Sequence, residues 1–222
     1  MGWDDTPFNR ADMVGFVETS GRPQPLDASM LARDLQQLLS GRRRLNLDLP
    51  SARRAGVLIV LYAKKGLPYI LLTKRSQLVA NHRGEISLPG GSADGGDESS
   101  METALRETWE EVGIRVQGTQ VLGGLDEIYT AKSNYVISPY VAYVESLDQI
   151  RPSEQEIVGV LEVPLGVLLD PANRREALRE IDGVPKRIQF YAYDDQEIWG
   201  ATARILDQFL EAVRETQKPA DS

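Results

Sequence analysis

A run of glycines followed by an acidic helix candidate is the sequence feature that most limits how this chain can fold. Residues 90–98 read Gly-Gly-Ser-Ala-Asp-Gly-Gly-Asp-Glu, and a helix is predicted over residues 100–112. Ser99 and Glu102 have the S-x-x-E spacing of a capping box, which marks the start of the helix. Gly113 stands where helices commonly end in the left-handed conformation. The sequence therefore predicts a glycine turn that leads directly into one capped helix.

Three glutamates lie on one stripe of this predicted helix. At about 100° per residue, Glu107, Glu110 and Glu111 fall within one arc roughly 100° wide. Like charges three and four residues apart destabilise a helix by a few tenths of a kcal/mol per pair, so the stripe needs a compensating cation. Carboxylates are hard oxygen ligands, and they favour Mg²⁺ or a similar divalent ion. The alternative is a solvated acidic face. A different face carries the residues suited to burial: Met101, Leu105, Thr108 and Val112.

Length and composition are those of an ordinary globular chain. With 222 residues, 41% hydrophobic and 26% charged, the chain is expected to form one domain, alone or with an extension. The net charge of −8 argues against a nucleic-acid polymer as partner, because binding to a phosphate backbone needs a basic face. No apolar run approaches the roughly 18 residues of a membrane span, and the N-terminus lacks the apolar core of a signal peptide. We therefore expect a cytoplasmic protein with no membrane partner.

Hydrophobic patterning predicts an α/β fold in which a mixed sheet has helices on both faces. Residues 1–25 are expected to form a loosely ordered arm, residues 26–214 one domain that starts with a helix over residues 26–41, and residues 215–222 a tail. Outside the acidic helix, the predicted strands are residues 55–62, 69–74, 121–129, 136–144 and 187–193, and the predicted helices are residues 164–169 and 201–213.

The segment from Glu98 to Ile114 resembles the Nudix box, G-x5-E-x7-R-E-U-x-E-E-x-G-U with U apolar. It departs from this pattern in two ways. Six residues rather than five separate Gly91 from Glu98, and Thr108 holds an apolar position. The resemblance implies a Nudix-type α/β/α sandwich with a mixed sheet, here with an additional N-terminal helix. It also implies a pyrophosphohydrolase that cleaves a nucleoside diphosphate linked to some other moiety.

The resemblance further implies roles for residues of the predicted site. Mg²⁺ or Mn²⁺ is expected on the three glutamates of the stripe, and the Gly91 carbonyl could reach the ion as a neutral ligand. Glu98 is expected to support this site. Arg106 is expected to orient Glu98 or Glu107 through an ion pair.

Residues 71–91 indicate a branch of the family more specifically than the box itself does. They are similar to the sequence that precedes the box in the coenzyme A pyrophosphatase branch of the family, roughly L-L-T-x-R-S-x-x-L-R-x-H-x-G-x-I-x-F-P-G-G. Asp94 and Asp97 also fit that branch and account for the extra residue. Ala80 and Leu88 depart from it, because the branch usually has arginine and phenylalanine there. Ala80 removes a cation that could grip a phosphate.

This branch implies a substrate. Coenzyme A or acyl-CoA would be split to adenosine 3′,5′-bisphosphate and (acyl-)4′-phosphopantetheine, and the resemblance covers roughly residues 26–213. Two alternatives stay open: a Nudix pyrophosphatase acting on ADP-ribose, NADH or dinucleotide polyphosphates, and a non-catalytic Nudix-like binding domain. The sequence leaves the oligomeric state open, with a homodimer among the options.

Four further residues complete the predicted site. Arg75 closes a strand candidate, where it could bind substrate phosphate or form a structural ion pair. His82, the only histidine, lies in a glycine-bearing loop and is expected to bind or orient substrate. Gly90 permits backbone conformations barred to other residues and is expected to bind substrate. The catalytic base is either a helix glutamate, such as Glu107, or Glu156 from a distant loop.

Overall fold

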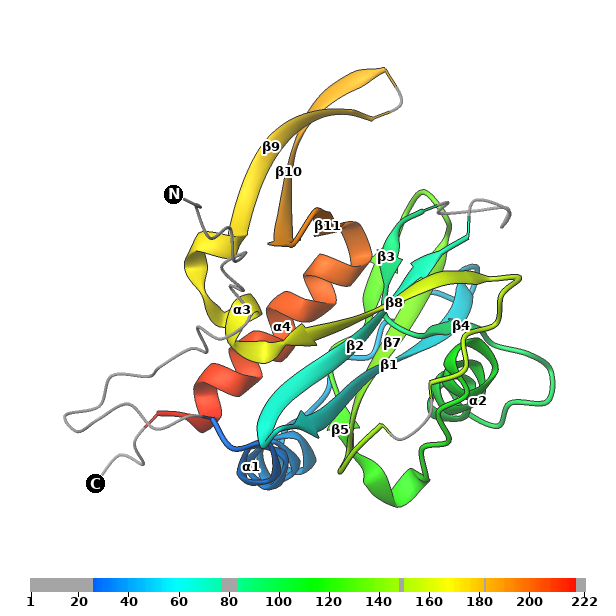
Figure 1. Cartoon of the computed structure of the whole chain (residues 1–222). Helices are drawn as coiled ribbons and strands as arrows, with labels where there is room; N and C mark the ends of the chain where they lie inside the picture. The colour runs from blue at the N-terminus through cyan, green and yellow to red at the C-terminus, as the bar shows by residue number, and fades with distance from the viewer. Residues whose placement is uncertain (1–25, 77–83, 148–149, 182, 219–222) are drawn as a thin grey trace, which may run out of the picture.

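The apolar run expected at residues 55–62 forms the central strand β1, Arg53–Lys64, in the computed structural model (Figure 1). The structure describes residues 26–76, 84–147, 150–181 and 183–218. Strand β1 pairs in parallel with β7, Tyr135–Val144, and antiparallel with β2, Leu67–Arg75. Residues 58–61 have no exposed surface. A continuous apolar run is typical of a strand that is covered on both faces.

Shorter strands extend this sheet. Its order is β3-β2-β1-β7-β5, and β4, β6 and β8 pair with β1, β7 and β2 respectively. The bounds of these strands are Ile86–Ser87 for β3, Gly90–Ser92 for β4, Val121–Gly124 for β5, Ile128–Thr130 for β6 and Ile157–Pro164 for β8. Both parallel and antiparallel pairs occur, so the predicted mixed sheet is confirmed.

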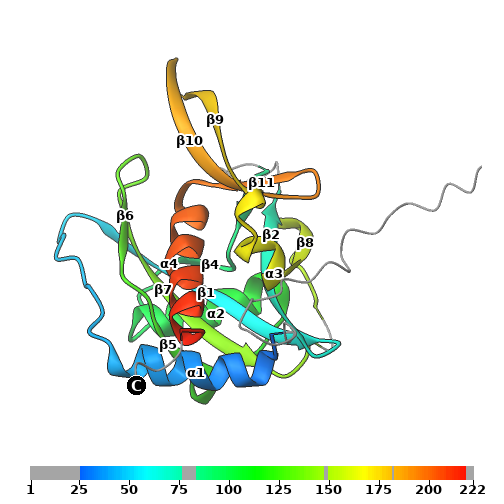
Figure 2. The same ribbon diagram turned by 90° about the vertical axis from the view of Figure 1, so that its left-hand side faces the viewer.

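Helices cover both faces of the sheet (Figures 1 and 2). Helices α1 (Ala28–Gly41) and α4 (Gly200–Thr216) lie on one face, and α2 (Ser100–Val112) lies on the other. Side chains of β1 alternate between the two cores: Ile59 packs in the core that includes α1 and α4, and Leu58 packs in the core that includes α2. The α/β/α sandwich with an additional N-terminal helix is therefore confirmed.

Helix α2 lies directly on β1 at Gly56. A Cβ atom added there would overlap the carbonyl oxygen of Ser100 and lie 2.8 Å from the amide nitrogen of Ala104. Glycine inside a strand often marks such a close approach of another backbone. Gly56 also pairs with Gly91 of β4 in antiparallel register. The glycine turn and the first turns of the acidic helix are thus fixed against the same strand.

The stretch at 121–129, expected as one strand, is two strands, because the backbone N–H groups of Asp126 and Glu127, between β5 and β6, bond to groups outside β7. The Glu127 amide donates to the carbonyl of Leu45 (3.0 Å), in the segment that follows α1. The side chains of Asp126 and Glu127 accept the backbone N–H groups of Leu45 (2.9 Å) and Leu47 (2.7 Å). A backbone group bonded to that segment cannot also bond to β7, so the strand is interrupted.

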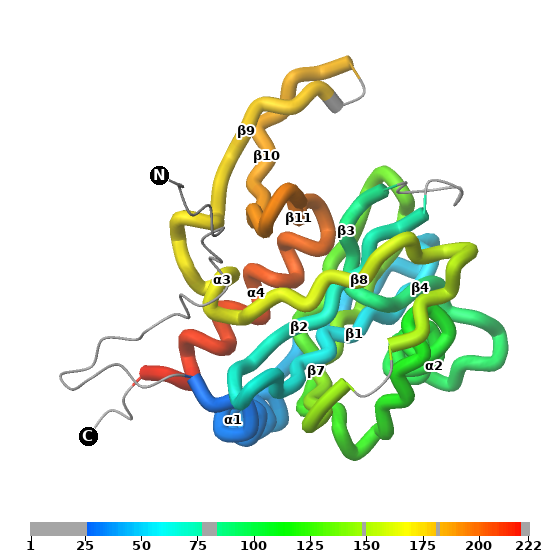
Figure 3. Tube along the Cα trace, viewed as in Figure 1, coloured from blue at the N-terminus to red at the C-terminus, as the bar shows by residue number. Residues whose placement is uncertain are grey.

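A second, smaller sheet follows the main one. Strands β9 (Arg174–Ile181), β10 (Val184–Tyr193) and β11 (Gln196–Trp199) form an antiparallel meander, preceded by the short helix α3 (Leu165–Leu169). The trace in Figure 3 shows the β9–β10 ribbon projecting from the body of the molecule. Helix α4 ends at Thr216 and so continues into the segment expected as a tail.

No helix within the described ranges is long and apolar enough to cross a membrane.

Candidate active site

Helix α2 begins and ends at the residues that the sequence predicts. The hydroxyl of Ser99 accepts the N–H of Glu102 (3.2 Å), and the Glu102 carboxylate accepts the N–H of Glu98 (2.8 Å), one residue before the cap. Gly113 has a φ of 72°, and its N–H donates to the carbonyl of Trp109 (2.9 Å). These caps fix the direction of the helix that carries the acidic stripe.

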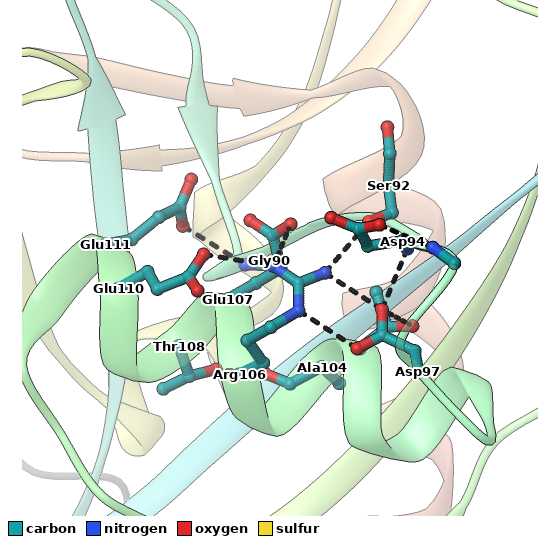
Figure 4. Close-up of polar contacts among 12 residues, drawn as sticks. Gly90, Ser92, Asp94, Asp97, Ala104, Arg106, Glu107, Thr108, Glu110 and Glu111 are labelled. Atoms are coloured by element: carbon teal, nitrogen blue, oxygen red, sulfur yellow. Dashed lines mark hydrogen bonds and ion pairs between the residues drawn. The ribbon is translucent and has the colours of Figure 1, made fainter.

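Arg106 is the centre of the polar network at the site (Figure 4). Its guanidinium binds both oxygens of Asp97, at 3.0 and 2.9 Å, in a bidentate pair. The same group contacts Glu107 at 2.9 Å and Glu110 at 3.0 Å, and donates to the carbonyl of Ser92 at 3.2 Å. Arg106 is therefore a compensating cation for the acidic stripe, and it ties the helix to the end of β4.

Of the two expected partners of Arg106, the structure has the ion pair with Glu107, and the bidentate partner is Asp97 rather than Glu98. Asp97 also accepts the backbone N–H of Asp94 (2.9 Å) and the hydroxyl of Thr103 (2.9 Å), so it is anchored at the start of α2. Hydrogen bonds from Arg106 hold the pKa of Asp97 well below its usual range. The side chain of Glu98 is exposed. Its backbone N–H donates to the carboxylate of Glu102.

Glu111 is the most buried carboxylate of the stripe, with 2% of its surface exposed. One oxygen accepts the N–H of Gly90 (3.1 Å), and the other contacts the guanidinium of Arg75 (3.3 Å). Burial raises the pKa of Glu111 to about 7, although these two partners oppose the rise. Arg75 therefore forms an ion pair with a carboxylate of the site, which was one of its two expected roles.

The raised pKa of Glu111 predicts a pH-dependent stability. The pKa of Glu111 is about 7 in the folded state and near 4.5 in the unfolded state, so the folded state holds the proton more tightly. The wild type therefore loses stability as pH rises from about 4.5 to about 7. We expect Glu111→Gln, which keeps the shape but cannot ionise, to be more stable than wild type by roughly 2 kcal/mol near pH 8 and by much less near pH 5. Urea unfolding at both pH values with EDTA measures this.

The control for that measurement is Glu211→Gln, which changes an exposed glutamate of α4. Its stability should follow that of the wild type at both pH values. A Glu111→Gln difference that is equal at the two pH values would contradict the linkage argument.

Glu107 is half-buried and lies against Gly91. A Cβ atom added at Gly91 would lie 2.5 Å from the carboxyl carbon of Glu107, so a side chain here would displace the carboxylate from its present position. Burial raises the pKa of Glu107, and its hydrogen bond with Arg106 opposes the rise. The contact places the backbone of Gly91 beside the acidic stripe.

Glu156 lies close to these carboxylates, in the turn before β8. Its carbonyl oxygen accepts the N–H of Ser76 (2.7 Å), and its side chain is exposed. Burial is the main cause of the raised pKa values of Glu107 and Glu111, and the negative charge of Glu156 adds to both. The structure thus brings a distant-loop glutamate to the helix stripe.

The site contains carboxylate oxygens of the kind that Mg²⁺ or Mn²⁺ prefers as ligands, but these carboxylates form ion pairs with arginines. Glu107 and Glu110 contact Arg106, and Glu111 contacts Arg75. Among the described residues, no three carboxylate or histidine side chains converge as a ready-made metal site. The donor set fits a divalent ion in its chemistry. Binding such an ion through these carboxylates would replace contacts that now go to arginine.

Thr108, the departure at an apolar position of the box, is fully buried. Its hydroxyl donates to the carbonyl of Ala104 (2.6 Å), one helical turn earlier, so burial leaves no unpaired polar group. The predicted substrate-binding residue His82 lies outside the described residues, as does Ala80.

Fold and site together define a class of protein: an α/β/α sandwich whose acidic helix follows a glycine turn. The sequence matches the NUDIX domain over residues 52–181. It is 35% identical over 179 residues to the uncharacterized Nudix hydrolase NudL of Photorhabdus laumondii, covering 77% of this chain and 95% of the relative. It is 34% identical over 161 residues to the protein of the same name from Yersinia pestis, covering 72% and 80%. The chain therefore belongs to the Nudix hydrolase family.

Solved structures show the same fold. The NUDIX domain of Shewanella oneidensis NrtR, complexed with ADP ribose, has a TM-score of 0.52 at 17% identity and covers 78% of this chain and 95% of that chain. A MutT protein from Methanosarcina mazei Go1 has a TM-score of 0.50 at 22% identity and covers 77% and 100%. Family membership makes the protein a pyrophosphohydrolase of pyrophosphate-containing substrates, in a family that generally uses divalent metal ions.

Proposed function

We propose that the protein hydrolyses the diphosphate of coenzyme A or acyl-CoA, giving adenosine 3′,5′-bisphosphate and (acyl-)4′-phosphopantetheine. One observation supports this most strongly: residues near both ends of the 71–91 stretch, which carries the similarity to the coenzyme A pyrophosphatase branch, contact a carboxylate of the acidic stripe. Arg75 from this stretch contacts Glu111 at 3.3 Å, and Gly90 from its end donates to Glu111 at 3.1 Å. The described ends of this stretch thus both contact Glu111, which supports a role for the stretch at the site.

Metal binding is assigned to the stripe. Glu107, Glu110 and Glu111, with the carbonyl of Gly91, are the residues proposed to hold Mg²⁺ or Mn²⁺. Such an ion, when bound, neutralises charge on the diphosphate and lowers the pKa of a water molecule. Arg106 positions Glu107 and Glu110, because its guanidinium contacts both carboxylates while Asp97 holds it from the other side.

Hydrolysis adds the oxygen of water to one phosphorus of the diphosphate. The bond from that phosphorus to the bridging oxygen breaks, and this oxygen leaves with the other phosphate. The proton of the water passes to a carboxylate, for which Glu156 and Glu107 are the proposed bases. Arg75, His82 and Gly90 are proposed to bind the substrate.

A second candidate substrate is ADP-ribose, with NADH and dinucleotide polyphosphates in the same class. The NrtR domain, whose structure contains ADP ribose, shares this fold. Ala80 also removes the arginine that the coenzyme A branch usually has. A non-catalytic binding domain is disfavoured, because a pure binder has no need for an intact glutamate stripe.

Substrate choice is tested with a panel of diphosphates, Mg²⁺ or Mn²⁺, and product identification by mass. We expect kcat/KM for coenzyme A to exceed that for dephospho-coenzyme A by about tenfold, because one charge-assisted contact to the 3′-phosphate is worth roughly 1.5 kcal/mol or more. The two compounds differ only in that phosphate, so each controls for the other. If ADP-ribose or NADH is turned over tenfold better than coenzyme A, the second candidate replaces the first.

A further inference from the structure

Arg75 links the end of β2 to the acidic stripe on α2. It is the last residue of β2 and pairs with Ile157 of β8, across an irregularity in the strand register. Its N–H donates to the carbonyl of Glu85 (3.0 Å), and its carbonyl accepts the N–H of Gly84 (3.2 Å). Its backbone is therefore fixed at the point where β2 ends, while its side chain contacts Glu111 of α2.

The guanidinium of Arg75 is only loosely engaged. Among the described residues, its guanidinium contacts Glu111, at 3.3 Å, whereas charge-assisted bonds of this kind are usually about 2.7–2.9 Å long. Its Nε is buried and has no hydrogen-bond partner in the part of the chain that the structure describes. Arg106, by contrast, makes contacts of 2.9–3.0 Å with three carboxylates. Buried polar groups are normally paired, so the unpaired Nε indicates a further, anionic partner.

Glu111 is held independently of Arg75. One of its oxygens accepts the backbone N–H of Gly90 (3.1 Å), and the helix caps fix the element on which it lies. Loss of the Arg75 contact therefore leaves the carboxylate anchored. A divalent cation on Glu111 would repel a guanidinium at contact distance, and a phosphate is the anion for which free guanidinium donors are best suited.

We propose that Arg75 is an exchangeable partner of Glu111: its guanidinium leaves Glu111 when that carboxylate binds a divalent ion, and then binds a phosphate of the substrate. This inference rests on the proposed function and names the order in which the site fills, ion first and phosphate second. Arg75 then opposes ion binding before substrate arrives and promotes phosphate binding afterwards.

This exchange predicts effects of opposite sign, which a purely structural role does not. Replacing Arg75 by an uncharged residue should tighten binding of the ion and weaken binding of the diphosphate. If Arg75 merely orients Glu111, the same replacement should weaken both.

Mn²⁺ binding to the substrate-free protein, followed by the electron paramagnetic resonance signal of free Mn²⁺, provides the first measurement. We expect Arg75→Met to bind its tightest Mn²⁺ roughly fivefold more strongly than wild type. The matched control is Lys74→Met, which removes the same charge from the neighbouring position of β2 and should stay within about twofold of wild type. If Arg75→Met does not fold, Mn²⁺ binding is measured on Arg75→Gln, for which we expect the same gain.

The second measurement is calorimetric binding of adenosine 5′-methylenediphosphonate, which cannot be hydrolysed at its bridge, at saturating Mn²⁺. We expect about tenfold weaker binding by Arg75→Met. Weaker Mn²⁺ binding by Arg75→Met, an equal gain in Lys74→Met, or unchanged binding of the diphosphonate would each overturn the exchange. Failure of the wild type to bind Mn²⁺ at all would instead overturn the proposed function, and the exchange with it.

Discussion

Glu110→Gln and Glu111→Gln should each lower kcat for diphosphate hydrolysis by about 10²- to 10³-fold, which is the usual cost of losing one group that stabilises charge in a transition state. Each substitution replaces a carboxylate proposed to hold the metal ion by an amide of the same shape. The measurement is kcat at saturating Mg²⁺, with circular dichroism to show that the fold is retained.

The two glutamates differ in their surroundings, and this separates metal binding from folding. The Glu110 side chain is 49% exposed and contacts Arg106, so Glu110→Gln should change the free energy of unfolding by no more than about 0.5 kcal/mol. Glu111 is buried, and its replacement by glutamine should stabilise the metal-free protein above neutral pH. Both variants should nevertheless lose turnover alike.

Glu211→Gln again provides the control, because it removes an exposed glutamate from α4, on the other face of the sheet. It should retain wild-type turnover. A loss of less than threefold in both Glu110→Gln and Glu111→Gln would remove the metal assignment from the stripe. A bound ion should raise the melting temperature of the wild type. The ion would lie elsewhere if the same rise occurs in the triple variant Glu107→Gln, Glu110→Gln, Glu111→Gln.

Local patterns predict the part of this site that lies on one element. The caps at Ser99 and Gly113 fix helix α2 to residue accuracy, and helical periodicity alone places Glu107, Glu110 and Glu111 on one stripe. The central strand is predicted because its burial on both faces demands an uninterrupted apolar run. Strand β9 is not predicted, since its sequence Arg-Arg-Glu-Ala-Leu-Arg-Glu-Ile is largely charged and pairs only within an exposed ribbon.

Contacts between elements are harder to predict. Asp97 fits the coenzyme A branch by sequence, but its bidentate pair with Arg106 depends on how the loop before α2 folds back on the helix. The contact between Arg75 and Glu111 joins the end of β2 to the end of α2 and has no local signature. The proximity of Glu156 depends likewise on the pairing of β8 with β2. Sequence identifies these residues as candidates, and only the tertiary fold brings them together.

The largest stability effect should come from Gly56→Ala. The added methyl group would overlap the carbonyl oxygen of Ser100 and lie 2.8 Å from the amide nitrogen of Ala104, and both are backbone atoms that cannot rotate away. Helix α2 would have to move off β1. Overpacking of this kind costs about 1–3 kcal/mol, and we expect about 3 kcal/mol here because the clash is with backbone. Urea unfolding of the purified variant measures it.

Two other glycines show whether that loss comes from the helix contact. Gly41→Ala, at the end of α1, has open space within 4 Å and should leave stability unchanged or slightly raised. At Gly91 the added Cβ would meet the end of the Glu107 side chain, which can move, so Gly91→Ala should lower turnover much more than stability. If Gly56→Ala unfolds no more easily than Gly41→Ala, the direct seating of the acidic helix on β1 is wrong. The geometry that links the glycine turn to the carboxylates would then be wrong as well.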